Sequence, residues 1–175
     1  MKKIWIIMLI TMTLLTTGIC YSMELDTKLM GKVIVIDVGH GGKDAGTSVS
    51  GIYEKDLNLA IALKLREMLI KQGVVVLMTR DGDYDLSSPN VSRRKKSDFD
   101  NRIDLINNSN ADLYLSIHIN YLEASKYYGA QVFYTDGNEL LANIMQDSFV
   151  SYLNSPLKEK KVSSDIYMYN KLKVP

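Results

Sequence analysis

The sequence is poor in cysteine and histidine, with one Cys and two His among 175 residues. Cys20 has no partner, so a disulfide within the chain is excluded. The 21 basic and 20 acidic side chains nearly cancel, and charge therefore gives no argument for nucleic acid as a partner. The H-E-x-x-H motif of thermolysin-like peptidases is absent, as are internal repeats and low-complexity segments. The length suits one domain with a full core.

The amino terminus predicts export. Met1-Lys2-Lys3 is a short basic start, and residues 4–19 are apolar and uncharged. This run is shorter than the roughly 20 residues of a membrane span. Residues 1–22 are therefore expected to be a cleaved signal peptide, and an uncleaved membrane anchor is the alternative. Ile19 before Cys20 argues against a lipoprotein. We expect an extracytoplasmic protein, in the cell wall or membrane-anchored, that contacts the membrane only through residues 1–22, with a polar connector over residues 23–32.

Apolar runs and helical periodicity alternate along the remainder of the chain. Strands are predicted at 33–37, 74–79, 113–117 and 129–134, and helices at 55–72, 99–108 and 139–152. This alternation predicts an α/β fold in three layers, a mostly parallel sheet with helices on both faces. The first two strands are expected to be buried on both faces because their residues are almost all apolar.

Two segments carry more specific expectations. Helix 55–72 should bury a stripe formed by Leu57, Ile61, Leu65 and Met68. The basic cluster over residues 92–97, S-R-R-K-K-S, is interpreted as an exposed loop in preference to a specific anion site.

Both histidines lie where predicted strands end. His40 follows the first strand, inside a glycine-rich loop that runs to Glu54, and His118 follows the third. The carboxyl ends of parallel strands are where α/β sheets bind ligands. Two imidazoles and one carboxylate form a catalytic zinc set with an open fourth position, so Glu54 is the candidate third ligand.

Each of these residues also has a plain structural explanation. A single histidine in apolar surroundings is commonly a hydrogen-bonded core residue, and Glu54 alone would suit the positive end of the helix that follows it. The pairing of two strand-end histidines with a carboxylate favours metal binding. Asp37 is interpreted equally well as a partner of a ligand histidine or as an ordinary strand-end residue.

Five motifs occur in a fixed order: Val35-Ile-Asp-Val-Gly-His-Gly-Gly-Lys-Asp-Ala-Gly46, Gly51-Ile-Tyr-Glu-Lys-Asp-Leu-Asn-Leu59, Leu77-Met-Thr-Arg80, Arg102 with Asn107, and Leu115-Ser-Ile-His-Ile-Asn120. Together they resemble the zinc-dependent N-acetylmuramoyl-L-alanine amidases of bacteria. The chain looks most like the germination-specific members from the spore cortex, the CwlD group. The resemblance covers the chain from about Lys32 to its end.

The resemblance implies that Zn²⁺ is bound by His40, Glu54 and His118. It also implies hydrolysis of the amide between the lactyl group of N-acetylmuramic acid and L-alanine in peptidoglycan, during cell-wall or spore-cortex remodelling. Peptidoglycan is then the partner, and an accessory protein is a further candidate. The candidates for positioning the ligands or the substrate are Asp37, Asn58, Arg80 and Asn120.

The family carries a catalytic glutamate on a last strand, soon after a Lys-Val-Pro-like sequence. Here residues 167–175 have the pattern of an approach to a strand, and Lys-Val-Pro stands at 173–175. None of Glu123, Glu139 and Glu159 has the matching context. We therefore expect residues 33–175 to form a catalytic domain without its last strand and general base. The alternatives are a zinc- or peptidoglycan-binding remnant and a zinc peptidase or deacylase on a similar sheet.

Overall fold

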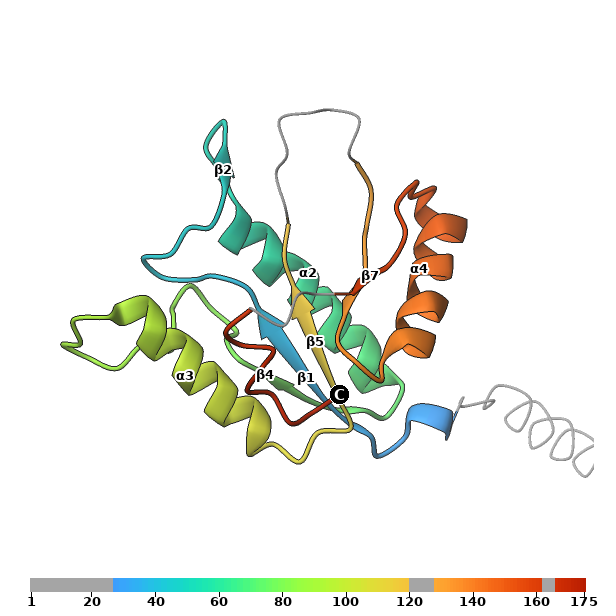
Figure 1. Cartoon of the computed structure of the whole chain (residues 1–175), viewed down its shortest axis with the longest axis horizontal. Helices are drawn as coiled ribbons and strands as arrows, with labels where there is room; N and C mark the ends of the chain where they lie inside the picture. The colour runs from blue at the N-terminus through green and yellow to red at the C-terminus, as the bar shows by residue number, and fades with distance from the viewer. Residues whose placement is uncertain (1–26, 120–127, 162–165) are drawn as a thin grey trace, which may run out of the picture.

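The computed structural model describes residues 27–119, 128–161 and 166–175. Predictions for residues 1–22 and for Asn120 fall outside these ranges. The elements are η1 (Thr27–Leu29), β1 (Val33–Val38), β2 (Ser48–Val49), β3 (Ile52–Tyr53), α2 (Glu54–Lys71), β4 (Val75–Met78), α3 (Arg94–Asn107), β5 (Leu113–Ile117), β6 (Phe133–Tyr134), α4 (Glu139–Leu153) and β7 (Lys160–Lys161) (Figure 1). None of these helices has the length and apolar character of a membrane span.

The main sheet is parallel, with the strand order β4-β1-β5. β1 is the central strand, in which Val35 pairs with Leu77 on one side and with Tyr114 on the other. Five of its six residues are buried. A central strand covered by neighbours on both edges and both faces needs a nearly continuous apolar run, which this segment provides.

Helices α2 and α3 cover opposite faces of the sheet. Successive side chains of a strand point to alternate faces. Ile36 and Val38 of β1 pack with Ala62 of α2, whereas Asp37, between them, binds Arg102 of α3. The α/β fold with helices on both faces is therefore confirmed (Figure 1).

The buried stripe of α2 differs from the predicted one. Leu57, Ile61 and Met68 are 41%, 42% and 65% exposed. The residues that α2 buries are Glu54, Asn58 and Ala62. They share the helical spacing of four residues, and the first two are polar. Of the predicted stripe, Leu65 does pack against the core, so apolar periodicity finds only part of the buried face. The helix is turned to bring its polar first turns to the edge of the sheet.

The basic cluster at 92–97 was predicted as a loop, and this is wrong in part, because α3 begins at Arg94. Arginine and lysine are good helix formers, and burial of Arg102, Ile103 and Ile106 further along fixes the helix against the sheet. The prediction of burial on both faces of β4 is also wrong. Val75 is 51% exposed because it lies on the face of this edge strand that α2 does not cover.

The predicted strand at 129–134 does not join the main sheet. Only Phe133–Tyr134 is extended, and it pairs in parallel with Lys160–Lys161 in a separate two-stranded sheet. The carboxyl-terminal segment instead reaches β5, where the amide of Tyr114 donates to the carbonyl of Pro175 at 2.8 Å. Asn107 binds the same segment through the Lys171 carbonyl at 2.9 Å and the Lys173 amide at 2.8 Å.

Candidate metal site

The chain leaves β1 through a tight turn that needs glycine at one position and strains the next. A Cβ on Gly39 would lie 2.4 Å from Cε1 of His118, so only glycine lets that ring approach the backbone. His40 has a φ of 62°, in the left-handed region that residues other than glycine rarely adopt. This conformation persists only where surrounding bonds hold it.

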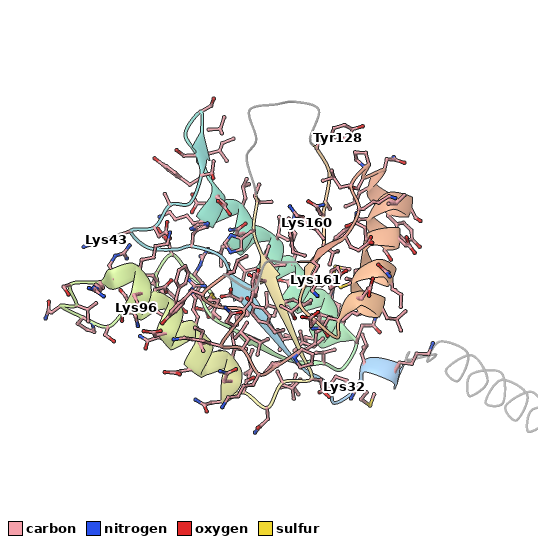
Figure 2. The ribbon with its side chains drawn as sticks, in the orientation of Figure 1. Lys32, Lys43, Lys96, Tyr128, Lys160 and Lys161 are labelled. Atoms are coloured by element: carbon pink, nitrogen blue, oxygen red, sulfur yellow. The ribbon has the colours of Figure 1, made fainter. Side chains whose placement is uncertain are left out.

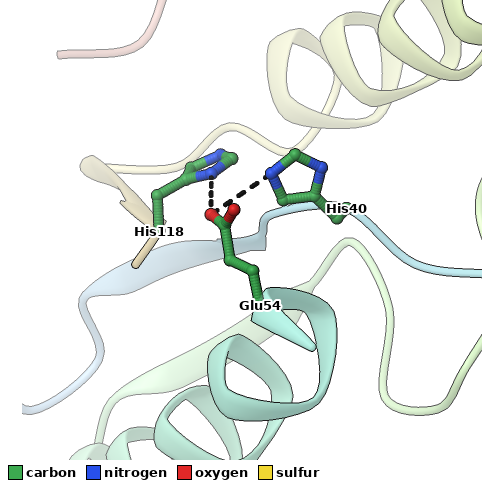
Figure 3. Close-up of side chains that lie close together, drawn as sticks. All are labelled: His40, Glu54 and His118. Carbon is green, nitrogen blue, oxygen red and sulfur yellow. Dashed lines mark hydrogen bonds and ion pairs between the residues drawn. The ribbon is translucent and has the colours of Figure 1, made fainter. Parts of the chain in front are cut away.

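Three side chains converge at this turn. His40 Nε2 lies 3.2 Å from Glu54 Oε1, and His118 Nδ1 lies 3.0 Å from the same oxygen. The two imidazole rings meet edge-on, with their centroids 4.9 Å apart. Figure 3 shows the two rings side by side above the carboxylate, which belongs to the first residue of α2. One ligand atom from each residue lies within 4.8 Å of the other two.

This donor set fits a divalent metal ion. Burial raises the pKa of Glu54, but hydrogen bonds from the Thr47 amide and His118 and the charge of His40 outweigh it, so the pKa is held below its ordinary value. The carboxylate is therefore ionised near neutral pH. Two imidazole nitrogens and one carboxylate oxygen are donors that zinc accepts.

The far side of His40 faces a second carboxylate. His40 Nδ1 is buried and makes no hydrogen bond within the part of the chain that is described. It lies 3.1 Å from Asp44 Oδ2, an ion-pair distance at an angle outside hydrogen-bond geometry. A carboxylate behind a ligand histidine is the usual means of fixing its tautomer and ring orientation. Asp44 was not singled out from the sequence, although it follows His40 by four residues.

Two buried arginines hold the backbone of the turn. Arg102 donates to the carbonyls of Val38 and His40, each at 2.8 Å. Arg80 donates to the carbonyl of Val38 at 3.1 Å and to that of Gly39 at 2.9 Å. Each guanidinium thus spans two carbonyls, a geometry that its planar fork allows. These bonds stabilise the strained backbone of His40.

Asp37 balances the charge of Arg102. Its Oδ1 lies 2.7 Å from Nη1 of Arg102, and both side chains are buried. Burial raises the pKa of Asp37, but Arg102 and a hydrogen bond from Thr79 outweigh it and hold the pKa below its usual value. Asp98 is the second carboxylate on Arg102, at 3.0 Å. Asp37 thus bonds to an arginine rather than to either histidine, which differs from its interpretation as a histidine partner.

The other candidates chosen from the sequence lie close to the ligands. Asn58 Nδ2 donates to the Gly39 carbonyl at 3.2 Å and to Glu54 Oε1 at 3.4 Å, and so supports the carboxylate from behind. Arg80 acts through the backbone, as described above. Arg102 was named from the sequence as part of a family motif, but its positioning role was not predicted, because a single arginine within a polar helix gives no signal of burial.

A cavity of about 170 Å³, the histidine pocket, opens beside His40 and His118. It lies between the ends of β1 and β5, helix α3 and the carboxyl-terminal segment at 166–169. Its described lining includes no glutamate, and Glu139 and Glu159 lie elsewhere.

The sequence matches the N-acetylmuramoyl-L-alanine amidase family over residues 34–175. The chain belongs to this family. It is 39% identical over 153 residues to the germination-specific N-acetylmuramoyl-L-alanine amidase of Bacillus subtilis, covering 84% of this chain and 65% of that protein. It is 37% identical over 121 residues to a probable cell wall amidase, LytH, of Staphylococcus aureus, covering 67% of this chain and 36% of that protein. The amidase chain therefore spans about two thirds or less of these relatives.

Solved amidase structures have the same fold. The CwlD amidase from Clostridioides difficile, in complex with the GerS lipoprotein, superposes with a TM-score of 0.76 at 36% identity, covering 83% of this chain and 79% of that one. The amidase AmiC2 of Nostoc punctiforme gives a TM-score of 0.68 at 26% identity, covering 82% and 75%. The expected family and fold are confirmed.

Proposed function

We propose that this amidase family member hydrolyses the amide between the lactyl group of N-acetylmuramic acid and L-alanine in peptidoglycan, with Zn²⁺ held by His40, Glu54 and His118. The observation that carries the proposal is the convergence of these three side chains within 4.8 Å, at the edge of the sheet where the strands end. The family match over residues 34–175 supports the choice of bond.

Zinc bound by this set supplies a water of lowered pKa and polarisation of the substrate carbonyl. The residues of the chain hold the set in place. The negative charge of Asp44, 3.1 Å from Nδ1 of His40, favours the tautomer with its proton on Nδ1, which leaves Nε2 free to bind the metal. Asn58 orients the carboxylate of Glu54. The leaving amine must also receive a proton, which a carboxylate normally delivers.

The described residues include no second carboxylic acid suited to this proton transfer, which favours a second candidate function. Among them, Glu54 is the one glutamate at the site, and it already faces both histidines. Without a positioned base and acid, hydrolysis loses about 10²- to 10⁴-fold in rate. The second candidate is therefore a domain that binds zinc or peptidoglycan with little turnover.

Product analysis on purified muropeptides tests these functions. Release of intact stem peptide from lactyl-muramic acid identifies the amidase, and a shortened stem identifies a peptidase. Bound zinc without any product identifies the binding remnant. The Glu54→Gln variant serves as the control that separates zinc-dependent cleavage from contaminating hydrolases.

The proposed setting is outside the cytoplasm, with residues 1–22 as a signal peptide or anchor and residues 33–175 as the catalytic domain. The relative from Clostridioides difficile was solved with a lipoprotein, and the relative from Bacillus subtilis is germination-specific. These two relatives support an accessory protein as a partner and a role in the spore cortex.

A further inference from the structure

A second cavity adjoins the histidine pocket at the start of α3. This charged pocket has a volume of about 190 Å³, and all six of its lining side chains are charged: Lys43, Asp44, Asp85, Arg94, Lys95 and Asp98. Asp44 and Asp98 line the histidine pocket as well. The two cavities therefore share a wall, and a ligand at the histidines lies beside the charged pocket.

The carboxylates of the charged pocket are already bonded within the fold. Asp98 accepts from Arg102 at 3.0 Å and from the Leu86 amide at 2.7 Å. Asp85 pairs with Arg94 and accepts from the amide of Ser87. The negative charge of these two carboxylates and the positive charge of Arg94 are therefore largely neutralised inside the protein. The third carboxylate, Asp44, lies 3.1 Å from Nδ1 of His40.

Of the cations that line the charged pocket, Lys43 and Lys95 are the least neutralised by neighbouring carboxylates. Lys95 approaches Asp44 only to 3.9 Å, and its side chain is 67% exposed. Lys43 makes no hydrogen bond or ion pair with the residues that the structure describes, and Figure 2 shows it projecting outward from the loop that follows β1. The charged pocket consequently presents one ammonium group, that of Lys43, without an ion pair to a described residue. A second, that of Lys95, is held only by the long ion pair with Asp44 and by the ring of Phe99, 5.8 Å away.

The first turn of α3 adds to the positive potential. It contains no acidic residue, and Arg93 at its N-cap gives no side-chain cap. Cations at the positive end of a helix dipole are unfavourable, and a bound anion removes that penalty. Lys96 is directed to the other side, toward Asp100 and the ring of Tyr167. Arg94 and Lys95 are the members of this turn that line the pocket, and Arg94 is paired with Asp85.

We propose that the charged pocket binds a carboxylate of the stem peptide, on the leaving-group side of the amide that lies at the histidines. The acyl side of that amide is an uncharged sugar, so the negative charge of the substrate lies on the peptide. The proposed subsite rests on the proposed function for its ligand, while Lys43 and Lys95 supply its charge. It defines the substrate as an anionic peptide joined to a neutral glycan.

Binding measurements with a matched pair of ligands test the subsite without requiring turnover. The ligands are N-acetylmuramoyl-L-alanyl-D-glutamate and its diamide, which differ only in the charge of their carboxyl groups. Dissociation constants are measured by titration calorimetry for the full chain, the Lys43→Gln/Lys95→Gln variant and a Lys64→Gln control. Lys64 is exposed on α2 and lines neither pocket.

The full chain and the Lys64→Gln control should prefer the acid to the diamide by about fivefold, the effect of one or two partly exposed ion pairs. The double variant should lose this preference, and 0.5 M salt should reduce it in the full chain. Equal binding of the two ligands, binding of neither, or a preference that survives in the double variant overturns the subsite. Hydrolysis products are assayed separately, so a chain that prefers the acid but cleaves neither ligand contradicts the amidase function alone.

Discussion

At the residue scale, the site is built from groups whose charges are fixed by their neighbours. His40 adopts a left-handed backbone, and its carbonyl is bonded by Arg102 at 2.8 Å. Glu54 and Asp37 both have pKa values held below the ordinary range, the first by amide groups and histidines and the second by a guanidinium, against the opposing effect of burial. Each carboxylate is therefore ionised when the protein is at neutral pH.

Zinc content tests the proposed ligands individually. The native chain should bind about one zinc, and His118→Ala or Glu54→Gln should lose most of it, because each removes one of three donors. Elemental analysis after dialysis measures the metal. Glu67→Gln, on an exposed part of the same helix as Glu54, should retain the native content. Unchanged zinc in His118→Ala would refute the ligand assignment.

The Asp37–Arg102 pair should dominate the acid stability of the fold. Asp37→Asn leaves a buried guanidinium without its closest carboxylate, which should lower the free energy of unfolding by about 3–5 kcal/mol at pH 7. Because the folded pKa of Asp37 is lowered, its stabilisation is present above the unfolded pKa of about 3.9 and is lost as the pH falls through the folded value.

Urea denaturation between pH 2.5 and pH 7 measures this effect. The free energy of unfolding of the native chain should fall steeply below about pH 4, where the unfolded state binds the proton first. In Asp37→Asn, this acid limb of the curve of stability against pH should be flatter. Asp147→Asn removes an exposed carboxylate on α4 and serves as the control, with little change expected. An acid limb of Asp37→Asn as steep as that of the native chain would contradict this origin.

At the element scale, the sequence predicted what apolar patterning controls and missed what buried polar groups control. β1, β5 and α4 lie where their apolar residues indicated, and the strand-end positions of His40 and His118 followed from them. The rotation of α2 was missed because Asn58 and Glu54 occupy its buried face. The start of α3 was missed because a run of basic residues is typical of both a loop and a helix end.

The carboxyl-terminal segment is attached to α3 through the side chains of Asn107 and Asp100, and to β5 through the Tyr114 amide. Asn107→Ala removes the acceptor of the Lys173 amide and the donor to the Lys171 carbonyl. Amide exchange at Lys173 should accelerate by about fivefold, since one hydrogen bond contributes roughly 1 kcal/mol. Hydrogen exchange followed by mass spectrometry or NMR measures this rate. The neighbouring Asn108→Ala, at an exposed position, should leave it unchanged, and equal rates in the two variants would show that Asn107 does not hold the segment.

At the scale of the whole molecule, the proposed substrate and the proposed route out of the cytoplasm must agree. Residues 1–25 fused to a reporter that is active only outside the cytoplasm should give a signal, because the Lys2-Lys3 start and the apolar run up to Ile19 are those of an export signal. The same reporter without residues 1–25 should stay silent. A silent fusion with residues 1–25 would count against export and against peptidoglycan as the substrate.

The two arginines at the turn after β1 also determine which substitutions the chain tolerates. In a mutational library, Val35 and Ile36 should exchange with other aliphatic residues at small cost, because similar volumes repack. Replacement of Arg80 or Arg102 should be costly, lysine included, since an ammonium group does not reproduce the planar fork that bonds the carbonyls on either side. Buried apolar positions are usually the least tolerant of substitution. In this protein we expect the reverse, with the buried polar positions the least tolerant and the buried apolar positions the more variable.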